Sequence, residues 1–206
     1  MQITFGSFTS HSKTYMPFFK ELESLYQKID NQYTRTAAGY GFVCSGCEEN
    51  CCLTRFYHHT LLEYLHILDG VDQMTAEMKE KILIRAETVN LKSNEADRKD
   101  ETIRLMCPLN QGGLCILYHR RPLICRLHGI PHLLERPGKG VLKGPGCREF
   151  EICCNDRNDI RLDRTPFYRQ MAQLEKRLRS ALLFQGKIKL TIAQMLVPER
   201  NDRCNP

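Results

Sequence analysis

Two cysteine-rich segments, held apart by a long interval without cysteine, constrain the fold of this chain more than any other feature. Residues 44–52, "CSGCEENCC", place four cysteines within nine positions. Residues 107–126, "CPLNQGGLCILYHRRPLICR", add three more. The 54 residues between them contain no cysteine and are long enough for helices. We therefore expect helices that carry cysteine-bearing loops toward one another.

Length and composition are those of a globular protein. The chain has 206 residues, of which 42% are hydrophobic and 26% are charged, as in ordinary folded domains. This length fits one domain and is sufficient to bury a core without cross-links. We predict a single domain over residues 1–206, with its core at about 14–185 and a tail at 186–206.

Apolar residues recur at spacings of three and four, which predicts amphipathic helices. The four segments with this pattern are residues 16–33, 58–70, 75–91 and 165–184. In the third, Met78, Ile82, Ile84 and Val89 are expected largely on one side. The polar run 92–101 is either the exposed end of that helix or a loop. The expected fold class is mostly α, a small helical domain whose cysteine-bearing loops are organised around a metal centre.

Strand signals are scarce, and Pro166 suits the first turn of the last helix. Only residues 186–196, "GKIKLTIAQML", allow a short extended piece.

The cellular compartment determines whether the eleven cysteines indicate disulfides or metal binding and catalysis. No apolar run approaches the length of a membrane helix, and the N-terminal residues lack the apolar region and cleavage site of a secretory signal. We therefore predict a cytoplasmic protein, in which thiols stay reduced. There, dense cysteine indicates metal binding or catalysis more often than disulfides.

The first cysteine segment has metal-ligand spacing. Two residues separate Cys44 from Cys47, which lets both sulfur atoms face one centre. Cys51 follows after three residues, and Cys52 is its neighbour. Because adjacent side chains diverge on an extended backbone, one of these two is expected to ligate while the other packs in the core or serves a second centre. A thioredoxin-like redox pair would instead require a βαβ unit.

The second segment adds a stiff turn and positive charge. Pro108 stiffens the turn after Cys107, and the glycine pair at 112–113 permits a tight turn back to Cys115. Arg121 and Arg126 flank Cys125. A four-iron cluster with four thiolates is anionic, so nearby guanidinium groups would stabilise it.

These motifs resemble the cysteine-cluster (CxxCxxCC) domain family of zinc- or iron-chelating proteins. The matching pieces are "CP" at 107–108, "GLCILY" at 113–118 and "RPLICR" at 121–126, and Cys147 in "GPGC" resembles a further cysteine of the family. The chain departs from the family pattern by one extra residue before Tyr118 and one before Cys51. The resemblance spans about residues 44–147.

The leading hypothesis is a metal-binding protein that holds an iron–sulfur cluster, with [4Fe–4S] favoured, or iron. The candidate ligands are Cys44, Cys47, Cys51, Cys52, Cys107, Cys115, Cys125 and Cys147, with Arg121 and Arg126 beside the cofactor. The alternative cofactor is zinc, because four cysteines also make a common structural zinc site. The protein would then be a structural or carrier module that presents an interaction surface. Nearby histidines such as His58 and His66 are expected to be ordinary surface or core residues.

Other functions have less support in the sequence. One branch of the family resembles flagellin lysine methyltransferases, but no glycine-rich nucleotide loop is evident here. Residues from 117 onward carry 18 Lys and Arg against 9 acidic residues, yet no nucleic-acid recognition motif accompanies this charge. Cys153 and Cys154 could be buried apolar residues, and Cys204 is expected to be unbound. The reaction, and whether the partner is a protein or a small substrate, stay open.

Overall fold

Helices dominate the computed structural model, which describes residues 12–44, 51–154 and 160–197. The helices are α2 (Ser12–Tyr40), α3 (Leu61–Asp72), α4 (Ala76–Arg98), α5 (Leu123–Leu127), α6 (Arg148–Cys154), α7 (Thr165–Ala181) and α8 (Ile192–Leu196). The short 3₁₀ turns are η1 (Cys51–Leu53) and η2 (Tyr118–Arg120), and the strands are β1 (Asn110–Gln111), β2 (Leu114–Cys115), β3 (His132–Arg136), β4 (Gly140–Gly144) and β5 (Leu162–Asp163). The predicted mostly α class is confirmed.

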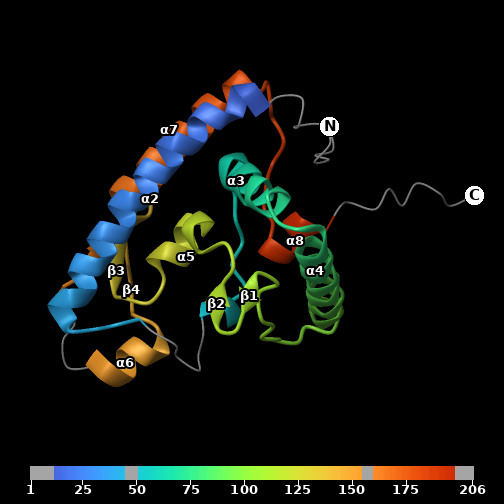
Figure 1. Cartoon of the computed structure of the whole chain (residues 1–206). Coiled ribbons are helices and arrows are strands. Elements are labelled where there is room, and N and C mark those ends of the chain that lie inside the picture. The colour runs from blue at the N-terminus through green and yellow to red at the C-terminus, as the bar shows by residue number, and fades with distance from the viewer. Residues whose placement is uncertain (1–11, 45–50, 155–159, 198–206) are drawn as a thin grey trace, which may run out of the picture.

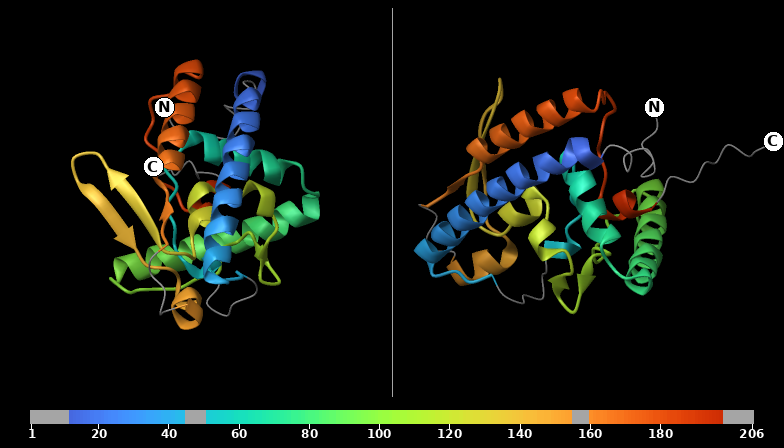
Figure 2. Two further views of the ribbon diagram at one scale, coloured as in Figure 1. Left: turned by 90° about the vertical axis from the view of Figure 1, so that its left-hand side faces the viewer. Right: turned by 45° about the horizontal axis from the view of Figure 1, so that its top comes forward.

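Two groups of helices enclose a central region. α2 and α7 pack side by side in opposite directions along one flank (Figure 1), and the two further views in Figure 2 show the same pair. α4 and α8 pack together on the other flank. Between these flanks lie α3, α5 and the β1–β2 hairpin (Figure 1). In the described part of the chain, no helix is both long enough and apolar enough to cross a membrane.

α2 contributes one stripe of the core. Leu22, Leu25, Tyr26 and Ile29 are buried at helical spacing, as the sequence pattern predicted. The helix extends beyond the predicted 16–33 at both ends, because the buried stripe itself continues through Tyr15 before that range and through Ala37 and Tyr40 after it.

Gly41 ends α2. Its φ of 68° is left-handed, which lets the Phe42 N–H donate back to the Ala37 carbonyl at 3.0 Å. This arrangement is the usual glycine-terminated helix end. It directs the chain into the first cysteine segment.

α3 and α4 begin at threonine caps, where Thr60 accepts from the Glu63 N–H and Thr75 from the Met78 N–H. α4 runs to Arg98, so most of the polar run 92–101 is the exposed end of the helix. The placement of Ile84 was wrong, because this side chain is 57% exposed. The buried stripe consists instead of Ile82, Ala86, Ser93 and Ala96.

The sequence did not predict the β3–β4 hairpin. β3 pairs antiparallel with β4 and parallel with β5. Most residues of the hairpin are at least partly exposed, so neither strand shows the alternation of apolar and polar residues that marks a half-buried strand. The expected extended piece at 186–196 was also largely wrong: Leu190 forms an isolated bridge with His58, and residues 192–196 form α8 behind a capping box at Thr191.

His66 is a polar residue inside the helical core. Its exposed fraction is 0%, and its ring meets Phe19 edge-on with centroids 4.9 Å apart. Within the described residues neither ring nitrogen has a hydrogen-bond partner, and Glu23 Oε1 lies 3.6 Å from Nε2. Burial, reinforced by the charges of Arg120 and Arg126, lowers the pKa of His66 to about 3.

His66 should make the fold sensitive to acid. The unfolded chain binds a proton at His66 below about pH 6.5, whereas the folded chain resists protonation down to about pH 3, so stability falls as the pH decreases through this interval. Between about pH 7.5 and pH 5 the native protein should lose about 2 kcal/mol more than His66→Leu. Urea unfolding followed by far-UV circular dichroism measures both, with the exposed His59→Leu as control. Equal losses in His66→Leu and the native protein would contradict the assignment.

Gly41 should matter through its backbone alone. Gly41→Val should lower the free energy of unfolding by about 1–2 kcal/mol, because a residue with a Cβ is strained in the left-handed conformation. Gly41→Asn should lose clearly less, since asparagine tolerates this region. Among the residues that the structure describes, no heavy atom outside its own neighbourhood lies within 4 Å of a Cβ built there, so crowding by them does not contribute. Equal effects of Val and Asn in urea unfolding would refute the explanation.

Candidate metal centre

The C-terminal end of α2 positions the first cysteine. Phe42 is buried beyond the helix end, and its ring meets Phe150 of α6 edge-on with centroids 5.1 Å apart. Cys44 follows and is exposed. Cys47, the next candidate ligand, lies outside the described residues. α2 and α6 thus fix where the first cysteine segment begins.

A backbone hydrogen bond joins the two cysteine-rich segments. The Cys107 N–H donates to the Cys52 carbonyl oxygen at 2.9 Å. Cys51 and Cys52 belong to η1 rather than to an extended strand, and their side chains are hydrogen-bonded to each other. This hydrogen bond is the largest cause of two opposite shifts. It lowers the pKa of Cys52 and raises the pKa of Cys51. Both thiols therefore face the same neighbourhood.

The β1–β2 hairpin returns the chain to Cys115. Residues 112 and 113 have φ of 60° and 87°, as the predicted tight turn requires. The pairing sets Asn110 opposite Cys115, and the Asn110 N–H donates to the Cys107 carbonyl at 2.9 Å. The side chain of Asn110 also contributes to the low pKa of Cys52. The hairpin therefore connects Cys107, Cys115 and Cys52 through one residue.

A buried carboxylate anchors α5, which carries Cys125. Glu63 of α3 accepts the N–H of Leu123, the first residue of α5, at 2.6 Å. It also accepts hydrogen bonds from Thr60 Oγ1 at 2.7 Å and from Tyr26 Oη at 3.3 Å. Burial raises the pKa of Glu63 despite these donors. One side chain thus fixes α5 to α2 and α3.

Five of the eight candidate ligands line one small cavity of about 90 Å³. They are Cys51, Cys52, Cys107, Cys115 and Cys125. Arg121 and His58 also line this cavity, which we call the thiol cavity. The topology therefore brings the first cysteine segment and the second to the same space.

Four of the thiols that line this cavity influence one another electrostatically. Every pair among Cys52, Cys107, Cys115 and Cys125 interacts electrostatically. Burial raises the pKa of Cys107 to about 12 and also raises those of Cys115 and Cys125, and the neighbouring thiols add to each shift. Without a cation these groups stay protonated, so a metal ion bound here would displace protons.

A second group of cysteines interacts electrostatically with Tyr33 of α2. Burial raises the pKa of Tyr33, and Cys44, Cys147 and Cys51 raise it further in that order. Burial raises the pKa of Cys44 as well, with Cys147 as the next cause. The Cys147 N–H donates to the Gly129 carbonyl at 2.9 Å. Cys51 is common to both groups, since it also interacts with Cys125.

The two predicted arginines occupy different places. Arg121 lines the thiol cavity, and its charge opposes the rise in the pKa of Cys44 and Cys115. Arg126 is buried and paired with Asp30 at 2.5 Å, and it does not line this cavity. Its charge still acts on Cys115.

Cys153 and Cys154 do not line the thiol cavity. Cys153 is exposed on α6, which is not the buried position expected of an apolar filler, whereas Cys154 is half-buried with its sulfur 3.9 Å from the Tyr40 carbonyl oxygen. Cys204 lies outside the described residues. Among the residues that the structure describes, no three His, Cys, Asp or Glu side chains are already arranged to hold a metal ion. The thiols are neighbours without forming a closed cage.

Sequence patterns did not single out Glu63 or Tyr33. A signal for Glu63 exists, because it interrupts the apolar run "LLEYLHIL", and a carboxylate on a buried helix face requires internal donors. Tyr33 gives no comparable signal, since its role depends on the distant Cys147. His58 had been expected to be an ordinary surface or core residue; it is buried and lines the thiol cavity.

No protein-family model, no curated protein and no solved structure matches this chain. The family resemblance therefore stays a hypothesis.

Glu63 should be essential to the position of α5. Glu63→Ala should lower the free energy of unfolding by about 3 kcal/mol, because the buried Leu123 N–H and Tyr26 hydroxyl lose their acceptor. Glu63→Gln keeps an acceptor oxygen and should stay within about 1 kcal/mol of the native protein. Urea unfolding provides the comparison. Similar losses in both variants would show that the carboxamide cannot replace the carboxylate.

Proposed function

We propose that this chain is a metal-binding protein that holds an iron–sulfur cluster through its clustered cysteines. The observation that carries the proposal is the thiol cavity, in which cysteines from both segments line about 90 Å³. Soft thiolates select iron–sulfur clusters, zinc or copper(I). A cytoplasmic location is part of the proposal, because these cysteines must stay reduced to bind metal.

The proposed principal ligands are Cys52, Cys107, Cys115 and Cys125. Each of these thiols interacts electrostatically with the other three, and four cysteine thiolates are the usual ligand set of a [4Fe–4S] cluster. Arg121 supplies positive charge at the cavity wall. Bound there, such a cluster would provide one-electron redox chemistry, while the protein fixes its ligands and surrounding charge.

Cys51 links this set to a second group of candidate ligands. It lines the thiol cavity and also interacts with Cys44. With Cys147, which shares Tyr33 as a neighbour, these cysteines could complete a second centre together with Cys47. The proposal therefore assigns Cys52 to the principal centre and Cys51 to the boundary between the two groups.

Zinc is the alternative cofactor. A four-cysteine zinc site would serve a structural or carrier role in a protein that presents an interaction surface. Iron–sulfur is favoured because the candidate set is wholly thiolate and exceeds four, and because Arg121 lines the same cavity. Methyltransferase-like activity is a lesser alternative, which only the resemblance to the cysteine-cluster family supports.

Anaerobic purification followed by metal and sulfide analysis tests the proposal. An iron–sulfur protein should be brown, contain iron and acid-labile sulfide in similar amounts, and give an electron paramagnetic resonance signal in one of its oxidation states. A colourless protein with stoichiometric zinc would overturn the cluster and support the zinc alternative. A protein without bound metal, after reconstitution with iron and sulfide has also failed, would overturn both.

Serine variants should separate principal ligands from other cysteines. Cys52→Ser and Cys115→Ser each remove one thiolate from the principal set and should lose most of the bound iron, at least about tenfold in affinity. Cys153→Ser should keep the native iron content, because this cysteine is exposed on α6. Iron and sulfide per chain, measured after anaerobic purification, give the comparison. Full iron content in Cys52→Ser would refute the proposed ligand set.

A further inference from the structure

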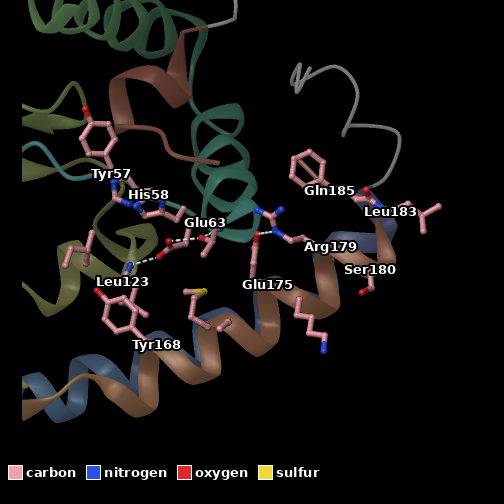
Figure 3. A pocket seen from close by; sticks show the side chains of 17 residues that line it. Tyr57, His58, Glu63, Leu123, Tyr168, Glu175, Arg179, Ser180, Leu183 and Gln185 are labelled. Atoms are coloured by element: carbon pink, nitrogen blue, oxygen red, sulfur yellow. Dashed lines mark hydrogen bonds and ion pairs between the residues drawn. The ribbon is translucent and has the colours of Figure 1, made fainter. Parts of the chain in front are cut away.

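A second cavity, much larger than the thiol cavity, lies beside α7. Its volume is about 960 Å³, within the range of about 300–1,000 Å³ typical of small-molecule sites. α7 forms one side, and α5, the start of α3 and residues 57–60 form the other (Figure 3). We call it the α7 cavity.

The walls of the α7 cavity are largely apolar and aromatic. The side chains that supply most of this surface are Tyr57, Leu123, Ile124, Tyr168, Met171 and Phe184. Such walls bind a ligand through burial of its apolar surface. The ligand's body should therefore be apolar or aromatic.

The two carboxylates in the lining are already engaged by the protein. Glu63 accepts hydrogen bonds from Leu123, Thr60 and Tyr26, as described above. Glu175 accepts the backbone N–H groups of residues 61 and 62 at 2.8 and 3.0 Å, and it also pairs with Arg179 (Figure 3). Both carboxylates are therefore committed to contacts within the protein.

His58 supplies an unused hydrogen-bonding group. Its side chain is only 2% exposed, and its Nε2 atom has no hydrogen-bond partner among the described residues. It lies at the same end of the cavity as Glu63, opposite Arg179 and Gln185 (Figure 3). A buried polar atom without a partner is costly, so a ligand that hydrogen-bonds to it gains affinity. His58 also lines the thiol cavity, which places this end beside the cysteines.

The charge that remains for a ligand is positive. Lys176 lines the α7 cavity from its exposed position on α7, and within the described ranges it forms no ion pair. At the opposite end, the carboxylate of Glu63 disfavours a negative group. An anionic ligand would therefore place its acidic group near Lys176.

We propose that the α7 cavity binds an organic acid with an apolar or aromatic body. Its body packs against α5 and α7, a neutral hydrogen-bonding group meets His58, and its acidic group lies near Lys176. None of the four proposed principal metal ligands lines the α7 cavity. This proposal can therefore be tested separately from the proposal of a metal centre.

The fluorescent aromatic acid anilinonaphthalene sulfonate is a suitable probe, because it combines an apolar body, an N–H group and an anionic group. The protein as purified, with whatever metal it holds, should bind one equivalent saturably with enhanced fluorescence. Ala172→Trp fills part of the cavity and should weaken binding at least about tenfold. Gln173→Trp is the matched control, since Gln173 is the exposed neighbour on α7 and does not line the cavity.

Two further variants test the polar ends. Lys176→Glu should weaken binding about fivefold by reversing one exposed charge. His58→Leu should weaken it by a similar factor of about five through loss of one hydrogen bond. His66→Leu should leave affinity unchanged, because this histidine lies outside the lining, although it too is buried with ring nitrogens that have no hydrogen-bond partner among the described residues. Circular dichroism checks that each variant is folded.

The outcomes are distinct. A selective loss of affinity in Ala172→Trp, Lys176→Glu and His58→Leu supports the site. Absence of saturable binding to the native protein overturns it, and so does equal affinity in Ala172→Trp and Gln173→Trp. Each variant is compared with the native protein at the same metal content, so these outcomes are separate from the question of whether the protein holds iron or zinc.

Discussion

The carboxylate of Glu63 is the interaction on which the central region depends. It is buried, and it receives hydrogen bonds from α2, from the cap of α3 and from the first N–H of α5. α5 has only five residues, too few to be stable as an isolated helix. Its position, and with it the position of Cys125, therefore follows from a side chain that lies 60 residues earlier in the chain.

The thiols beside this anchor sit in an environment that opposes their ionisation. Burial keeps Cys107, Cys115 and Cys125 protonated, and each neighbouring thiol makes a second negative charge more costly. Arg121 and the hydrogen bond between Cys51 and Cys52 act in the opposite direction at Cys52. A metal cation that prefers thiolate ligands removes this cost of ionisation. It neutralises the negative charges of the thiolates, which the protein alone does not neutralise.

Sequence patterns predicted the helices well and their surroundings less well. Apolar spacing identified the helices at 16–33 and 165–184, since both bury one face, but it did not give their ends: α2 continues to Tyr40 before the left-handed Gly41, and α7 ends at Ala181. The sequence pattern did not predict the β3–β4 hairpin, because the residues of this hairpin are mostly exposed. Cysteine spacing indicated which segments belong together. It could not reveal the hydrogen bond between Cys107 and Cys52 or the partners of Glu63, because both join residues far apart in the chain.

The short helix α5 separates the two cavities. Pro122 and Cys125 border the thiol cavity, whereas Leu123 and Ile124 border the α7 cavity. A displacement of α5 therefore changes both walls together. If binding in one cavity shifts this helix and so changes affinity in the other, thermodynamic linkage requires that the second ligand change the affinity for the first by the same factor. Five residues would then act as a shared partition, through which occupancy on one side sets affinity on the other.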